Sequence, residues 1–226
     1  MANYHDIRYN HNFPSAATGA MVHIKTLTAS SSATLSFVDG ASDVVLDNTY
    51  KTYIFRCTNI HPSAVQTLHF NASVDTGSNY NVSKTTTFFR SSHDEANTAT
   101  SLAYVDADLA NGTGTQRLSA GIDTANDAAG CGTLQIFNPS STTFVKHFLA
   151  RFQVENQAAS QETYVAGYCN TTSAVDAIQF SMSSGNIDAG TIKFVVEEKW
   201  TDLLQLVLIT VIGAYFGGRS LEKTKK

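Results

Sequence analysis

The chain has 226 residues, a net charge of −4 and a charged fraction of only 15%, and its length suits one large domain or one domain with an appendage. Its size allows a self-sufficient core without disulfides or metals. No basic stretch interleaved with aromatic residues occurs in residues 20–196, which argues against nucleic-acid binding.

The N-terminal segment and the cysteines both indicate a protein made in a reducing compartment. Residues 1–19 are polar and lack the continuous apolar run of a secretory signal, so we expect a polar arm that docks on a neighbouring molecule. Cys57, Cys131 and Cys169 are odd in number, widely spaced and without a CxxC pair. This pattern predicts separate thiols instead of a disulfide framework or a zinc site.

The first half of residues 20–196 alternates between apolar and polar side chains, as half-buried strands do. Strands are predicted over 22–28, 35–38, 50–60, 68–74 and 84–90. Asp39-Gly40 is typical of a β-hairpin turn after the second strand. His61-Pro62 is predicted to end the third strand.

The second half begins irregularly and then returns to alternation. Glycine-rich loops occupy much of 91–131, and a short helix is predicted near 95–102. Further strands are predicted over 134–137, 145–154, 164–169, 178–182 and 191–196. A series of about nine or ten short strands without interleaved helices predicts an all-β fold. We expect an antiparallel β-sandwich of the jelly-roll kind over residues 20–196.

Composition changes sharply after this domain, and residues 197–226 predict one apolar helix with a basic tail. The segment 200–219 would be about 30 Å long as a helix, enough to cross a bilayer core. The alternative is a helix buried in an oligomer interface. A basic tail favours an inside C-terminus and hence an outside β-domain, which conflicts with the lack of an export signal. The residues predicted to anchor the helix or to pair it with another are Trp200, Gly213, Tyr215, Gly217 and Arg219.

No motif of a hydrolase, a metalloprotease or a nucleotide-binding enzyme is present, so we predict no catalytic, cofactor or metal site. Scattered histidines on alternating strand positions are expected on sheet surfaces, and aspartates without the calcium-loop spacing are expected in solvated loops. These residues are His23, His69 and His147, and Asp39, Asp43, Asp47, Asp106 and Asp108.

Aromatic residues offer one further possibility, a glycan-binding face. Core or sheet packing is the expectation for most of them. The candidates are Tyr80, Phe88, Phe89, Tyr104 and Tyr164.

Several stretches resemble a family of uncharacterised structural proteins of marine bacteriophages. They are YHDIRY at 4–9, the Ser-rich run at 24–33 with 37–40, GSNYNV at 77–82, FNPSST at 137–142 and MSSGNID at 182–188, continuing to Lys193. The resemblance covers nearly all of residues 1–194 and implies a virion setting without a defined activity. Residues 212–223 resemble instead the C-terminal end of holin-type phage membrane proteins, and the single helix argues against a lytic pore.

Together these features predict a non-enzymatic virion structural or adhesion component, such as a tail fibre, collar or head-decoration protein. Its expected partners are further copies of itself, other virion proteins and, on the host surface, glycans. One alternative is a membrane-anchored phage protein that acts at the host envelope through residues 200–219. The other is a lectin-like, glycan-binding module.

Overall fold

The computed structural model describes residues 21–197, which contain twelve strands and no helix. The all-β prediction is therefore confirmed for this part of the chain. The strands are β1 (Met21–Thr28), β2 (Thr34–Val38), β3 (Thr52–Pro62), β4 (Leu68–Ser73), β5 (Lys84–Asp94), β6 (Thr100–Tyr104), β7 (Gln116–Arg117), β8 (Gly130–Phe137), β9 (Lys146–Glu155), β10 (Ala159–Cys169), β11 (Ala177–Met182) and β12 (Ile187–Glu197).

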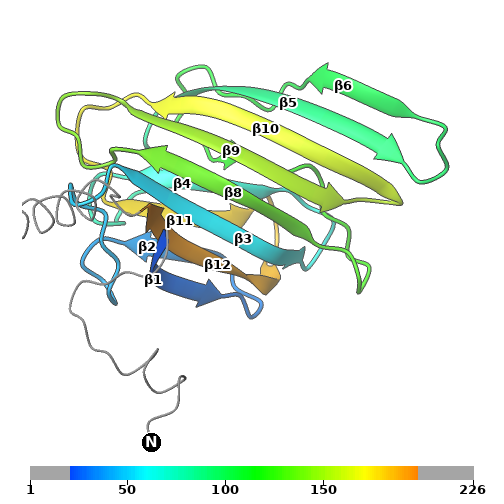
Figure 1. The fold of residues 1–226 in the computed structure, drawn as a ribbon, viewed down its shortest axis with the longest axis horizontal. Coiled ribbons are helices and arrows are strands. Elements are labelled where there is room, and N and C mark those ends of the chain that lie inside the picture. The colour runs from blue at the N-terminus through cyan, green and yellow to red at the C-terminus, as the bar shows by residue number, and fades with distance from the viewer. Residues whose placement is uncertain (1–20, 198–226) are drawn as a thin grey trace, which may run out of the picture. The chain divides into compact units, whose positions relative to one another are not determined.

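The strands form two antiparallel sheets that pack face to face as a β-sandwich (Figure 1). The larger sheet has eight strands in the order β1-β12-β3-β8-β9-β10-β5-β6, and the smaller has four in the order β2-β11-β4-β7. Because the small sheet has half as many strands, it covers only part of the inner face of the large one. The large sheet thus provides most of the outer surface.

A cluster of aromatic rings fills the space between the sheets. Phe55 of β3 stacks on Phe194 of β12, with ring centroids 4.7 Å apart. Two rings from the small sheet contact Phe55 from the opposite side, Phe37 at 5.2 Å and Phe180 at 5.4 Å. All four side chains have no exposed surface. Buried aromatic pairs of this kind contribute beyond their buried area and fix how two sheets sit on each other.

The turn at Asp39-Gly40 is present, but the hairpin predicted from it is wrong. Gly40 adopts a left-handed φ of 75°, and the Asp39 carboxylate accepts a hydrogen bond from the Leu46 amide at 2.8 Å. The chain then crosses to the other sheet, since β2 pairs with β11 whereas β3 pairs with β12 and β8. A local turn signal does not reveal which sheet the next strand joins.

One further local expectation needs correction, and another is confirmed. The helix predicted near 95–102 is absent, because β5 continues to Asp94 and a turn follows that leads into β6. The Asp94 carboxylate accepts hydrogen bonds from the backbone amides of Thr98 and Ala99 and so shapes this turn. The predicted end of β3 at His61-Pro62 is confirmed, because Pro62 forms its last residue, opposite Ile187. A proline is tolerated there because the end of a strand requires no amide donor.

The N-terminal arm over 1–19 and most of the C-terminal segment lie outside the described residues. The five residues predicted to anchor or pair the C-terminal helix therefore have no described position: Trp200, Gly213, Tyr215, Gly217 and Arg219. Within residues 21–197, no helix has the length and apolarity needed to cross a membrane.

Candidate functional site

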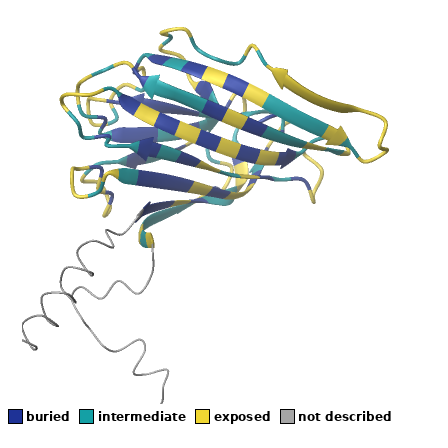
Figure 2. Cartoon of the chain, turned by 45° about the horizontal axis from the view of Figure 1, so that its top comes forward, coloured by how far each residue is buried: buried dark blue, intermediate teal, exposed yellow. Residues whose placement is uncertain are grey.

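The outer face of the eight-stranded sheet presents large apolar side chains to solvent. Buried and exposed residues alternate strictly along most of β9 (Figure 2), so that Phe148, Ala150 and Phe152 point into the core. The residues between them, among which Leu149 is 50% exposed, point outward. An apolar side chain of this size on an exposed sheet face is a sign of an interaction surface when others lie beside it.

Four outward side chains from four neighbouring strands form one row across the sheet. In the strand register, Arg151 of β9 lies opposite Tyr164 of β10, Tyr164 opposite Phe89 of β5, and Phe89 opposite Tyr104 of β6. The three rings are each between 41% and 54% exposed. Phe89 and Tyr104 meet edge to face, with centroids 5.3 Å apart. Directly opposite residues on one sheet face are close enough for their rings to act as a continuous platform.

A second row of polar and aromatic side chains crosses the same face further along the strands. Tyr168 of β10 lies opposite His147 of β9 and Thr85 of β5, and the His147 and Tyr168 rings are 6.1 Å apart. Tyr164 and Tyr168 are four residues apart on one strand, so their backbones are separated by about 14 Å. Two ring-bearing rows thus flank a central row without rings, in which Ala166 of β10 lies opposite Leu149 of β9 and Thr87 of β5.

The central row is the floor of two adjoining open hollows of about 380 and 470 Å³. Thr87, Leu149 and Ala166 line both of them, which makes the two hollows one groove. The further lining residues are Phe89, Thr133, Gln135, Ala150, Arg151, Tyr164 and Val165 of the first hollow, and Thr85, Thr86, Phe137, His147, Phe148, Gly167 and Tyr168 of the second.

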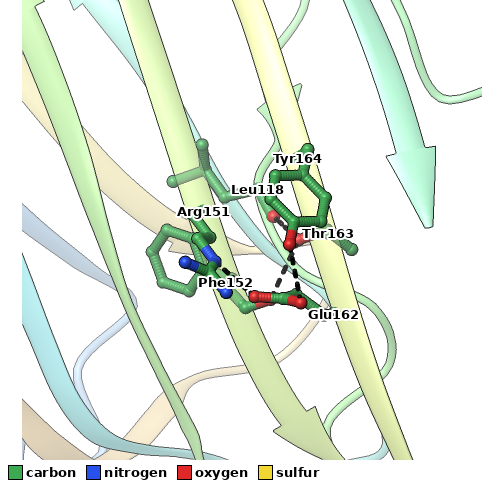
Figure 3. Close-up of polar contacts among 6 residues, drawn as sticks. All are labelled: Leu118, Arg151, Phe152, Glu162, Thr163 and Tyr164. Carbon is green, nitrogen blue, oxygen red and sulfur yellow. Dashed lines mark hydrogen bonds and ion pairs between the residues drawn. The ribbon is translucent and has the colours of Figure 1, made fainter. Parts of the chain in front are cut away.

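Tyr164 is held in place by a charged pair at the edge of the groove (Figure 3). Its hydroxyl donates a hydrogen bond of 2.8 Å to Glu162, and the Arg151 guanidinium lies 5.3 Å from the centre of its ring. Arg151 and Glu162 themselves form an ion pair. This pairing lowers the pKa of Glu162 and raises that of Arg151, and the hydrogen bond to Glu162 raises the pKa of Tyr164. The ring is thereby oriented before any ligand arrives.

The layer beneath the groove is rigid and tightly packed. The Thr163 hydroxyl, on the buried side of β10, donates a hydrogen bond of 2.6 Å to the carbonyl of Leu118 (Figure 3). At Gly167, a Cβ atom would lie 2.6 Å from the Thr86 methyl group and 2.9 Å from the Phe148 ring. Strand β10 therefore requires glycine at this position, because only glycine lets its backbone lie this close to the neighbouring strands. The floor of the groove cannot move inward on ligand binding, because the layer below it is already filled.

The structure divides the five aromatic candidates into two groups. Phe89, Tyr104 and Tyr164 come together on the outer face, whereas Phe88 is fully buried and Tyr80 is half-buried in the turn after β4. Sequence reasoning missed the side chains that complete the groove, although the alternation along β9 could have revealed the outward ones. These are Phe137, Leu149, Arg151, Glu162 and Tyr168.

The remaining polar candidates serve turns and sheet surfaces. His23 and His147 are exposed as expected, but His69 is half-buried between two threonine hydroxyls, at 2.7 Å from Thr67 Oγ1 and 2.9 Å from Thr115 Oγ1. Cys57 and Cys169 are buried free thiols, and Cys131 is an exposed one.

Among residues 21–197, no three His, Cys, Asp or Glu side chains are grouped so as to hold a metal ion. Asp39, Asp47 and Asp108 accept hydrogen bonds from nearby residues, and Asp43 and Asp106 lie in loops.

No protein-family model, no curated protein and no solved structure matches this chain. Its function is therefore inferred from the residues of the groove.

Proposed function

We propose that this chain is an adhesion protein that binds a neutral oligosaccharide, without cleaving it, in the groove of the eight-stranded sheet. The observation that carries the proposal is the row of exposed rings, Phe89, Tyr104 and Tyr164, beside two joined hollows whose shared floor is Thr87, Leu149 and Ala166. A sandwich does not need these rings outside its core for stability, and an exposed aromatic row has a cost in solubility. Ligand binding accounts for their position.

The chemistry of the groove matches that of a sugar chain. A pyranose ring has a face of C–H groups that packs on an aromatic or aliphatic side chain, and a rim of hydroxyls that exchanges hydrogen bonds. Phe89, Tyr164 and Leu149 supply the apolar surface, and Thr87 and Gln135 supply donors and acceptors within the same hollow. A site that binds a small ligand specifically usually has a few polar groups placed among apolar ones. The roughly 14 Å between the two ring-bearing rows suits several sugar units instead of one.

The charges of the groove favour a neutral ligand and binding without hydrolysis. Arg151 is neutralised by Glu162 at the groove edge, so no free cation is directed at an acidic sugar from the described lining. Glycoside hydrolysis requires two carboxyl groups placed on either side of the scissile bond. Glu162 is engaged with Arg151 and Tyr164, and no carboxylate is among the residues that line the two hollows.

The setting we propose is the virion, on the strength of the resemblance to marine bacteriophage structural proteins. A shallow groove binds one sugar chain weakly, and several copies in a homo-oligomer would raise the overall avidity by orders of magnitude. The jelly-roll topology and the apolar helix over 200–219 stay predictions from the sequence. The membrane-anchored alternative depends on that helix and is not needed for the groove to act.

The test is a screen of the full-length protein on an array of neutral and acidic glycans, followed by calorimetric titration of the best ligand. We expect binding to neutral oligosaccharides and at least a tenfold loss of affinity in Tyr164→Ala and Phe89→Ala. Phe144→Ala is the matched control, because Phe144 is 69% exposed but lines neither hollow. Its affinity should equal that of the wild type.

Three results would contradict the proposal. One is the absence of binding to every glycan on the array. Another is binding that Tyr164→Ala and Phe89→Ala leave unchanged. The third is release of shortened sugar products, which would show an enzyme.

A further inference from the structure

Lys84, the first residue of β5, is buried in the sandwich without a carboxylate partner. Its side chain has no exposed surface. Nζ donates to the side-chain oxygen of Asn71 at 2.5 Å and to the carbonyl of Val82 at 2.7 Å. A buried ammonium group without a counter-ion is costly, and proteins usually relieve that cost by shifting the group to its neutral form.

We propose that Lys84 and Asn71 become joined by a covalent amide bond that forms within the folded chain. Since a C=O bond is about 1.23 Å long, Nζ lies within about 3.7 Å of the Asn71 carboxamide carbon. Reacting atoms held about 3–3.5 Å apart are close to an attacking geometry, and such fixation replaces a large entropic cost. Asn71 is 3% exposed, so little water competes for the carbon.

The reaction balances without any further reactant. The lone pair of the neutral Lys84 amine attacks the carboxamide carbon of Asn71 and forms a C–N bond. The bond from that carbon to Nδ2 then breaks, and one proton passes from Nζ to Nδ2. The products are an amide between the two side chains and one molecule of ammonia. No electron is gained or lost overall.

The surroundings assist both partners of the reaction. Burial lowers the pKa of Lys84 to about 8, so a useful fraction of the amine is neutral near neutral pH. The Ala72 amide donates a hydrogen bond of 2.9 Å to the Asn71 side-chain oxygen and would stabilise the negative charge that develops there. The carboxamide nitrogen is held by the carbonyls of Tyr80 at 2.5 Å and Thr113 at 3.1 Å, which fixes the plane of the group.

The bond would tie the two sheets of the sandwich together, because Asn71 belongs to β4 of the small sheet and Lys84 to β5 of the large one. Such a link would resist separation of the sheets under force. The inference does not depend on carbohydrate binding, and either proposal can fail without the other.

Lys146 provides a matched control within the same protein. It is equally buried, but its Nζ donates to two backbone carbonyls, those of Phe144 and Thr171, at 3.0 and 3.1 Å. Backbone amides of this kind have no ammonia to release. Lys146→Met should therefore leave the proposed bond intact, whereas Lys84→Met should abolish it.

The experiment is mass spectrometry of the purified full-length protein after digestion with trypsin. Trypsin should fail to cleave after Lys84 and should yield a peptide over 57–90 whose mass is about 17 Da, one ammonia, below that of its sequence. The Lys146→Met protein should give the same peptide. Normal cleavage after Lys84 with no mass deficit in the wild-type protein would overturn the proposal.

A cyclic imide at Asn71 would also lose one ammonia, and the Lys84→Met variant distinguishes the two cases. The imide does not need Lys84, so a deficit that persists in Lys84→Met would refute the cross-link. A deficit present in the wild type and in Lys146→Met, but absent from Lys84→Met and Asn71→Ala, is the expected result. Because the measurement is made on digested protein, a partly unfolded variant still gives an answer.

Discussion

Replacing Phe55 tests whether the ring cluster between the sheets supplies the stability of the sandwich. Removing a buried Phe side chain to Ala costs about 3–5 kcal/mol. Phe55 stacks on Phe194 and also contacts Phe37 and Phe180, and each ring pair adds about 0.5–1.5 kcal/mol beyond the buried area. We therefore expect Phe55→Ala to lie at the upper end, with a loss of about 4–5 kcal/mol in the free energy of unfolding.

The assay is urea unfolding followed by circular dichroism, with Phe55→Leu as a milder variant. Phe55→Leu keeps most of the side-chain volume and loses mainly the ring pairs, so a loss of about 1.5–3 kcal/mol is expected. Phe89→Ala, on the outer face and 43% exposed, should lose less than about 1 kcal/mol. Equal losses for Phe55→Ala and Phe89→Ala, or a loss below about 1.5 kcal/mol for Phe55→Ala, would refute this account of the core.

Three further predictions follow from buried groups and from domain limits. Burial lowers the pKa of His69 to about 4, below the pKa of 6.5 in the unfolded chain. The stability that the neutral imidazole allows is therefore fully present above pH 6.5, and the free energy of unfolding decreases by about 1.4 kcal/mol for each pH unit as the pH falls from 6.5 to 4. In urea unfolding curves measured across this range, the stability of His69→Gln should depend less on pH than that of the wild type. Gly132→Ala should destabilise by about 1–3 kcal/mol, because a Cβ there would overlap the Phe152 ring, whereas Gly114→Ala, with open space around it, should be neutral in the same assay. Removal of residues 198–226 should leave a cooperatively melting protein with a strand-rich dichroism spectrum, and a collapse of that spectrum would show that this segment belongs to the core.

Most strands could be predicted from the sequence, except β6 and β7, but the partners of the strands could not. Alternation is a local property, so the strand predicted over 178–182 agrees with β11 to within one residue. Its neighbour β2 is distant along the chain, and the pairing of Phe37 with Ile178 depends on how rings pack between the sheets. The chain also changes sheet repeatedly between consecutive strands, which no turn motif reveals.

The candidate groove was predictable only in part, for two physical reasons. Phe88 and Phe89 are adjacent aromatics on one strand, and only the position of the opposite sheet decides which of them faces inward. The row that joins Arg151 to Tyr164 follows from the hairpin between β9 and β10. That hairpin turns at Gln157 and Ala158, both with positive φ. Neither residue is the glycine or asparagine that normally indicates such a turn in a sequence.

The imbalance between the two sheets also sets a hierarchy of local opening. Strand β6 lies at the edge of the large sheet with all five residues exposed, including Leu102 at 78%, so detaching it uncovers little apolar surface and requires little free energy. Its amide protons should exchange with solvent through such brief local events, long before those of the central strands β8 and β9. Tyr104 sits on this loosely held strand against Phe89. The β6 end of the aromatic row is thus the end that opens more easily, although the Tyr104 hydroxyl donates a hydrogen bond to Asp108 at 2.8 Å. A ligand that contacts both Tyr104 and Tyr164 would therefore slow hydrogen exchange in β6 without changing the exchange that requires global unfolding.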